Sequence, residues 1–344
     1  MKKHLKKIIS IGIVLAVYAL VIVLVQSGAL SRHYQSLLVP IGINVILAVS
    51  LNLTVGFLGE LTLGHAGFMS VGAYAGCLFS IYCDLPTAIE FPLALIIGGI
   101  TAAIFGVIIG IPALRLKGDY LAIVTLAFGE IIRSVITNLD FLGGAGGLKG
   151  IAKYKSTASG FTTVFVVLII TVIVILNLVK SRHGRAICSI RDNVIASESV
   201  GINVVFYKLL AFVTAAFFAG VAGVLYGHNL GILKPNTFDF NKSIEILVIV
   251  VLGGMGSITG SIISAIVITL LPEVLRGLED YRLLIYAVVL IAMMLLNNNP
   301  KFNTFKENIK AKLRPGKKSA AENASVDINA TANVSENAAE KEAE

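Results

Sequence analysis

Apolar segments long enough to cross a bilayer recur from one end of this chain to the other. They lie at residues 8–25, 37–55, 65–82, 91–111, 120–139, 161–179, 209–228, 244–254, 258–275 and 283–296, the eighth being short. A helix needs about 20 apolar residues to span the hydrocarbon core, so the repetition predicts an all-α, polytopic integral membrane protein of about ten transmembrane helices. A transmembrane β-barrel would instead show alternating segments of about ten residues.

The composition favours this class over a soluble fold. Of the 344 residues, 56% are hydrophobic and only 14% are charged, and the mean hydropathy is +0.87. The three cysteines, Cys77, Cys83 and Cys188, form no CxxC pair and no cluster with histidine. The sequence therefore indicates neither a metal site nor a disulfide framework.

Lysine and arginine residues gather in loops and at the chain ends, so the net charge of +8 indicates membrane topology and not nucleic-acid binding. The lysines within residues 2–7 place the N-terminus in the cytoplasm. The apolar segment after them is too long for a signal peptide and lacks a small-x-small cleavage site, so we expect an uncleaved first span. Alternation then places the basic stretches 115–117, 180–191 and 301–314 inside, with both termini cytoplasmic. One loop disagrees, because Lys149, Lys153 and Lys155 fall outside.

Composition divides the chain into two regions. Residues 1–296 form the predicted transmembrane domain, and residues 297–344 form a cytoplasmic tail that is first basic and then acidic and polar. The final stretch, ENASVDINATANVSENAAEKEAE, has few large apolar residues, so it is expected to be disordered.

Glycine interrupts two short apolar segments, LTVGFLGELTLGHAGF at 53–68 and VVLGGMGSITGSII at 250–263. Paired broken helices in the two halves of a chain indicate a transport pathway, because freed backbone groups at membrane depth need a protein or water-filled environment. The candidate pathway residues are Gly59, Glu60, Gly64, His65, Gly253, Gly254 and Gly256. The alternative is close helix packing, which the GxxxG spacings at 72–76, 106–110, 223–227 and 256–260 favour.

Five ionisable residues fall within or beside the predicted spans: Glu60, His65, Glu130, Arg133 and Glu245. A charge at the helix centre costs roughly 2.5–3.5 kcal/mol on insertion scales, so these side chains are expected to face protein. Glu130 and Arg133 lie three residues apart, which predicts a local ion pair. His65 is either a hydrogen-bonded core residue or part of the pathway.

The segment SRHGRAICSIRDNVIASESVGINVVFYK, residues 181–208, is too polar to cross the membrane. Apolar residues at positions 187, 190, 194 and 195 predict a short amphipathic helix, which Gly201 ends as a C-terminal cap. Such a helix lies on the membrane or docks into a groove of a partner. Its mixture of charged and small residues favours docking.

The chain has no GxxxxGK[ST] phosphate-binding loop, since Gly316 and the residues after it lack the upstream glycine. A nucleophile elbow, an HExxH motif and a kinase motif set are also absent from the sequence. We therefore expect a protein that is not an enzyme, has no catalytic residues and does not hydrolyse ATP itself.

Four stretches together resemble the LivH/LivM permease family of bacterial branched-chain amino acid ABC transporters, and the M-type subunits in particular. They are GELTLGHAGFMSVGAYAG, LRLKGDYLAIVTLAFGEIIR, SRHGRAICSIRDNVIASESVGINVVFYKLLAF and FDFNKSIEILVIVVLGGMGSITGSIISA. The likeness covers residues 37–297 in matching order and spacing.

The resemblance implies one permease subunit of an importer in a bacterial cytoplasmic membrane. Its expected partners are a second related permease, two cytoplasmic ATPase subunits that use ATP and Mg²⁺, an extracytoplasmic binding protein and membrane lipid. The coupling residues expected to dock on an ATPase subunit are Arg185, Arg191, Asp192, Asn193, Ala196, Ser197, Glu198, Gly201, Ile202 and Asn203. Many such permeases carry EAA-x-x-x-G here, whereas this chain has Ile195, Ala196 and Ser197 before Gly201, with a glutamate displaced to position 198.

The resemblance also implies branched-chain amino acids as the solute, moved by alternating access that the partner ATPases drive. Related permeases serve urea and sugars, which remain alternatives. A secondary transporter without an ATPase is a further alternative from a different class.

Overall fold

The computed structural model describes residues 16–27 except 17, residues 31–274 except 84 and 117, and residues 288 and 291. The chain divides into two compact units, Met1–Tyr286 and Ala287–Glu344. The predicted spans at 8–25 and 283–296 lie largely outside the described residues, and the tail at 297–344 lies wholly outside them.

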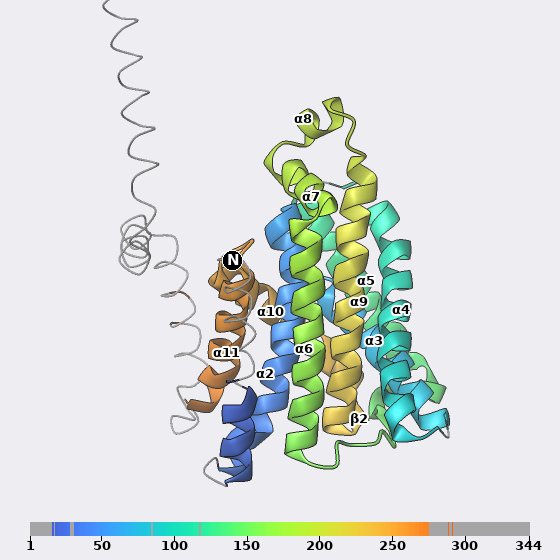
Figure 1. The fold of residues 1–344 in the computed structure, drawn as a ribbon. Helices are drawn as coiled ribbons and strands as arrows, with labels where there is room; N and C mark the ends of the chain where they lie inside the picture. The colour runs from blue at the N-terminus through green and yellow to red at the C-terminus, as the bar shows by residue number, and fades with distance from the viewer. Residues whose placement is uncertain are drawn as a thin grey trace, which may run out of the picture. The chain divides into compact units, whose positions relative to one another are not determined.

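The described part of the chain is almost entirely helical (Figure 1). Its helices are α2 (Arg32–Asn52), the π-helix η1 (Leu53–Leu58), α3 (His65–Tyr82), α4 (Thr87–Ala113), α5 (Asp119–Asn138), α6 (Thr157–Lys180), α7 (Arg182–Asp192), α8 (Val194–Ser199), α9 (Val204–Leu230), α10 (Phe240–Gly253) and α11 (Ile258–Val274). Short 3-10 turns are η2 (Asp140–Leu142), η3 (Gly144–Gly146) and η4 (Pro235–Phe238). The strands β1 (Leu148–Lys149) and β2 (Ile232–Leu233) pair antiparallel, with Leu148 opposite Leu233.

Five helical segments of the described part are long and apolar enough to cross a membrane: His33–Leu58, Ile89–Ala113, Asp119–Asn138, Thr157–Lys180 and Val204–Leu230. A shorter apolar helix occupies Ile258–Glu273. These segments confirm the all-α membrane class.

The predicted start of the seventh span, at residue 209, is wrong. Helix α9 begins five residues earlier at Val204, because Asn203 caps it by accepting a hydrogen bond from the Phe206 N–H at 3.0 Å. Lys208 lies inside this helix and is buried. Its charge excluded it from the apolar segment, although a buried partner stabilises it within the fold.

Helices α3, α4 and α9 form the most extensive helix–helix contacts of the described residues. Glycine makes this approach possible, since any side chain at Gly72 would collide with the backbone of Gly220. A Cβ at Gly98 would lie 2.7 Å from the Gly72 carbonyl oxygen, and one at Gly223 would strike the carbonyl of Met69. The packing interpretation of the GxxxG glycines is therefore correct for these helices.

The two ends of the helical bundle differ in structure. Figure 1 shows α7 and α8 at one end and β2 at the other. Helix α6, with 24 residues, joins the loop that holds β1 to α7. The lysine-rich loop therefore lies at the end opposite α7, as the predicted alternation requires. In it, the Lys153 side chain packs against Gly231 at the end of α9.

Candidate coupling site

The segment predicted to dock on a partner forms two helices instead of one. Asn193 separates α7 from α8 with an extended backbone (φ −160°, ψ 109°), and its side chain accepts a hydrogen bond from the Ala196 N–H at 3.0 Å. The prediction of a single amphipathic helix through positions 187, 190, 194 and 195 is therefore wrong. Ile187 and Ile190 are buried, whereas Ile195 is 80% exposed. An asparagine cap restarts the helix in a new direction, which periodicity does not register.

Helix α7 is held firmly against the end of the bundle. The chain reverses sharply after α6, so that any side chain at Gly184 would collide with the carbonyl oxygen of Val179. Ser181 caps α7 by accepting a hydrogen bond from the Gly184 N–H at 3.2 Å. Its apolar face then joins a cluster contributed by η1, α7 and α9, whose buried members are Leu53, Leu58, Ile187, Ile190, Val204 and Ala211.

Helix α8 projects from this end, and exposed apolar side chains lie on it and at its C-cap. Val194, Ile195 and Val200 are 37%, 80% and 76% exposed. We call these three residues the apolar tip. Apolar groups gathered at the end of a bundle are typical of a contact with another protein.

Several predicted coupling residues have structural roles in this segment. Ser197 is buried, and its hydroxyl donates to the Asn193 carbonyl at 2.8 Å. Gly201 has φ +83°, and the Ile202 N–H reaches back to the Ser197 carbonyl at 3.0 Å. The predicted glycine cap is therefore confirmed. The other members of the predicted set that lie at the surface are Arg185, Asp192, Ala196, Glu198 and Asn203, the last of which caps α9.

Arg191, in the last turn of α7, contacts the first glycine-interrupted segment. Its Nη1 donates to the Gly56 carbonyl at 3.2 Å, and its Nε and Nη2 donate to Asp192 Oδ1 at 3.1 and 2.9 Å. Its methylene groups pack on Gly59, where a Cβ would lie 2.6 Å from Arg191 Cγ. Gly59 ends the π-helix with φ +81°, so a side chain is excluded there both by conformation and by space.

The second glycine-interrupted segment meets the first at the same place. The Gly256 N–H donates to Asn52 Oδ1 at 2.8 Å, and Asn52 Nδ2 donates to Ser261 Oγ at 2.9 Å. Gly254 and Gly256 have φ of +87° and +78°, which turn the chain between α10 and α11. Asn52 therefore joins the end of α2 to this turn. Sequence reasoning missed Asn52 and Gly56, since neither residue type signals a contact 200 positions away.

A buried ion pair lies just beyond the first break. Lys208 Nζ contacts Glu60 Oε1, and the two side chains are only 8% and 14% exposed. The Glu60 N–H also donates to the Thr54 carbonyl at 3.1 Å, closing the π-helical turn. The sequence does not reveal this partner of Glu60, because Lys208 belongs to a polar segment predicted to be a loop.

Three other predicted pathway residues lie in tightly packed surroundings. His65 is buried, and a hydrogen bond of 2.9 Å joins its Nε2 to Ser50 Oγ. Gly64 faces the backbone of Thr125, whose carbonyl oxygen would lie 2.7 Å from an added Cβ. Gly253 packs against Gly260 of α11. A transport role for these positions stays a prediction.

The predicted ion pair in α5 is confirmed. Arg133 Nη2 lies 2.7 Å from Glu130 Oε2, and Arg133 Nε donates to the same oxygen at 2.8 Å. Glu245 pairs with Lys242 at 3.1 Å. Both pairs lie at a distance from α7, on α5 and α10.

Titration and metal chemistry add little to this end of the bundle. Burial raises the pKa of the Cys188 thiol in α7 above its usual range, which lowers the fraction of reactive thiolate. Among the residues that the structure describes, no group of three histidine, cysteine or acidic side chains is placed to hold a metal ion.

The contacts around Arg191 define what this arrangement can do mechanically. A rigidly seated helix holds two helix breaks that are far apart in the sequence, and a short helix with an apolar tip extends beyond it. Helix α7 thus contacts the first break directly, and Asn52 joins this break to the second.

Comparison with known proteins finds similarity to the same permease family that the four sequence stretches resemble. Residues 34–296 match the family described as branched-chain amino acid transport system / permease component. The chain is 36% identical over 284 residues to LivM, the high-affinity branched-chain amino acid transport system permease protein of Escherichia coli (strain K12), covering 74% of this chain and 66% of LivM. The Salmonella typhimurium LivM is 34% identical over the same shares of the two chains.

More distant similarity extends to sugar transport. The ribose import permease protein RbsC of Haemophilus influenzae is 26% identical over 74% of this chain and 82% of RbsC. The chain spans 66% of the length of each of the two LivM relatives. No solved structure matches this chain.

Proposed function

The chain belongs to the family of branched-chain amino acid transport-system permease components, and we propose that it is the membrane-spanning permease subunit of an ATP-binding-cassette importer for leucine, isoleucine and valine. We propose further that it has about ten spans with both termini in the cytoplasm of a bacterium. It assembles with a second permease, two cytoplasmic ATPase subunits that bind ATP and Mg²⁺, and an extracytoplasmic binding protein.

The contact of Arg191 with Gly56, beside Gly256, carries the proposal. In this scheme the apolar tip of α8 enters a groove of an ATPase subunit. Closure of the ATPase pair on ATP moves α8 together with α7, because Ser197 Oγ of α8 donates to Ser189 Oγ of α7 at 3.2 Å. Helix α7 passes this movement to the first break, because its buried isoleucines pack against η1. The two helix breaks then change their arrangement together, which opens the route to one side of the membrane and closes it to the other.

Reconstitution tests the proposal directly. The chain is placed in proteoliposomes alone, with the second permease, and with all partner subunits, and uptake of labelled leucine is measured with and without ATP. We expect accumulation only in the complete assembly with ATP. Accumulation by the chain alone, driven by an ion gradient, would identify a secondary transporter instead.

The similarity to the ribose import permease RbsC makes a sugar the second candidate solute. The same proteoliposomes, supplied with the cognate binding protein, distinguish the candidates when labelled leucine, ribose and urea are compared. Uptake of leucine alone supports the amino acid assignment, and uptake of ribose or urea alone refutes it.

A further inference from the structure

Charged and amide side chains gather on α5, on η4 and on the first turns of α10. They are Glu130, Arg133, Asn236, Asn241, Lys242 and Glu245, and we call this group the polar face. Three of its charged side chains, Glu130, Arg133 and Glu245, are 34%, 32% and 35% exposed. None of these three is therefore enclosed by the chain itself.

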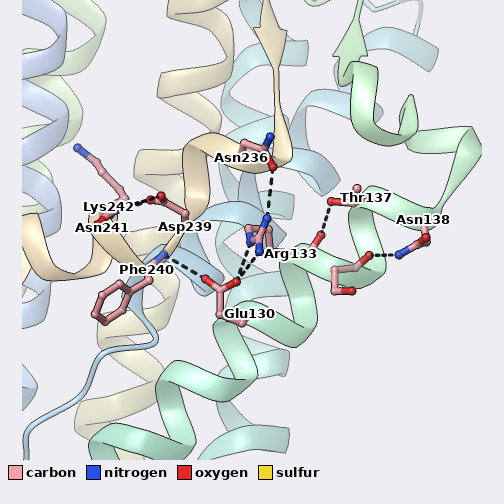
Figure 2. Close-up of polar contacts among 10 residues, drawn as sticks. Glu130, Arg133, Thr137, Asn138, Asn236, Asp239, Phe240, Asn241 and Lys242 are labelled. Carbon is pink, nitrogen blue, oxygen red and sulfur yellow. Dashed lines mark hydrogen bonds and ion pairs between the residues drawn. The ribbon is translucent and has the colours of Figure 1, made fainter.

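The polar face is organised around the start of α10. Glu130 accepts a hydrogen bond from the Phe240 N–H at 3.1 Å while it holds Arg133, and Arg133 Nη1 donates to Asn236 Oδ1 at 3.3 Å (Figure 2). Asp239 caps α10 through the Lys242 N–H at 3.1 Å. Helix α5 therefore fixes the position at which α10 begins.

The second ion pair extends this network to α2. Lys242 Nζ donates to Glu245 Oε2 at 3.1 Å and to Asn44 Oδ1 at 3.2 Å. Asn44 Nδ2 in turn donates to Thr269 Oγ1 of α11 at 2.9 Å. The polar face is thus held in place by four helices, α2, α5, α10 and α11.

The polar face lies near the middle of the bundle's length. Glu130 comes 11 residues after Asp119, the first residue of α5, or about 17 Å along a helix of about 30 Å. Helix α10 has 14 residues, about 21 Å, which is too short to cross a bilayer. It runs from Glu130 to the turn held by Asn52, so its first residues lie at membrane depth.

Hydrocarbon does not solvate such groups, and two other faces of the bundle expose apolar side chains instead. The exposed side chains of α4 include Ile96, Ile100, Ile104 and Ile108, and those of α6 include Val166, Ile170 and Ile173. Charged residues at membrane depth face protein or a water-filled cavity. The apolar faces of α4 and α6 therefore suit lipid, and the polar face does not.

We propose that the polar face lines a water-filled solute route, and that its two ion pairs contact the ammonium and carboxylate groups of a passing α-amino acid. This inference rests on the proposed permease function and moves the solute contacts from the helix breaks to the start of α10. Each pair presents both signs of charge. Glu130 and Glu245 would accept from the solute ammonium group, and Arg133 and Lys242 would donate to its carboxylate.

Cysteine accessibility in the complete transporter tests the proposal. In a Cys83→Ser, Cys188→Ser background, Asn241→Cys is compared with Ile104→Cys, which is also exposed and lies in the middle third of α4, on its apolar face. Cys77 is fully buried and is kept. The probe is a charged, membrane-impermeant methanethiosulfonate, which reacts with thiolate and therefore requires water at the thiol.

We expect Asn241→Cys to react at least tenfold faster than Ile104→Cys, and its modification to block leucine uptake. Leucine should slow the labelling, whereas isoamylamine and isocaproate, which each lack one charged group, should not. Equal labelling rates would overturn the water-filled route and indicate a dry contact with the second permease. Unimpaired uptake after labelling would also overturn it. If isoamylamine or isocaproate slowed labelling as much as leucine does, or if leucine did not slow it, the proposed contact with both solute charges would be overturned.

The controls separate this inference from the proposed function. ATP-dependent leucine uptake by the unlabelled background protein is measured first, and its absence counts against the proposed function alone. The labelling rates still report on water at the polar face in that case. Normal uptake with equal labelling of the two variants counts against the inference alone.

Discussion

The buried pair Glu60–Lys208 provides a quantitative test of how the first helix break is stabilised. Both side chains are at most 14% exposed, so neither charge regains much water when its partner is removed. Breaking a buried ion pair in this way costs about 3–5 kcal/mol, because one charge is left uncompensated. We therefore expect Lys208→Met to destabilise the protein by about this amount, and Glu60→Gln by less, since the amide oxygen still accepts from the ammonium group.

Thermal unfolding in detergent measures the effect. At about 2–4 °C per kcal/mol for domains of 150–250 residues, Lys208→Met should lower the melting temperature by about 6–20 °C. The double variant Glu60→Gln, Lys208→Met should recover much of the loss, because it removes both charges together. Lys149→Met, an exposed lysine at the opposite end, is the matched control and should change stability by less than about 0.5 kcal/mol. Equal melting of Lys208→Met and wild type would refute the argument from burial.

Three further predictions concern the coupling site. Ile195→Glu should leave the melting temperature unchanged but lower ATPase co-purification at least fivefold, because the side chain is 80% exposed on α8; normal co-purification would show that α8 does not dock. Asn52→Ala should lower the free energy of unfolding by about 1–3 kcal/mol, because the Gly256 N–H loses its acceptor. Thermal unfolding measures this change, and wild-type stability would contradict it. In a Cys83→Ser background, Cys188 should react with maleimide more slowly than glutathione at pH 7.5, since its raised pKa lowers the fraction of thiolate. The rate should rise as the pH increases towards 10. A rate equal to that of glutathione would disprove the shift.

The membrane fold was predictable because hydrocarbon imposes a length on every spanning helix. The apolar segments at 91–111, 120–139 and 161–179 each lie within one observed helix, or within one residue of it. The predicted first and last residues of the helices were less accurate, since a cap such as Asn203 starts a helix before its apolar part begins. A charged residue within a span, such as Lys208, breaks the apolar pattern even where a partner neutralises it.

The breaks at Gly59 and Gly254 were predictable from glycine alone, because few other residues adopt positive φ. What joins the breaks was not predictable. Asn52 to Gly256 and Arg191 to Gly56 are pairings across more than 100 residues, and a single sequence contains no signal for them. The exposure of Ile195 was missed for a local reason, since the Asn193 cap rotates α8 away from the face that α7 buries.

Helices α3, α4 and α9 meet backbone to backbone at Gly72, Gly98 and Gly220. Side chains repack when helices slide, but two main chains in contact have nothing to rearrange. We therefore expect α3, α4 and α9 to keep their mutual arrangement when the transporter changes conformation, while α2, α10 and α11 change position relative to them. Spin labels on α4 and α9 should keep their separation through the ATP cycle, while a label on α10 should move relative to both.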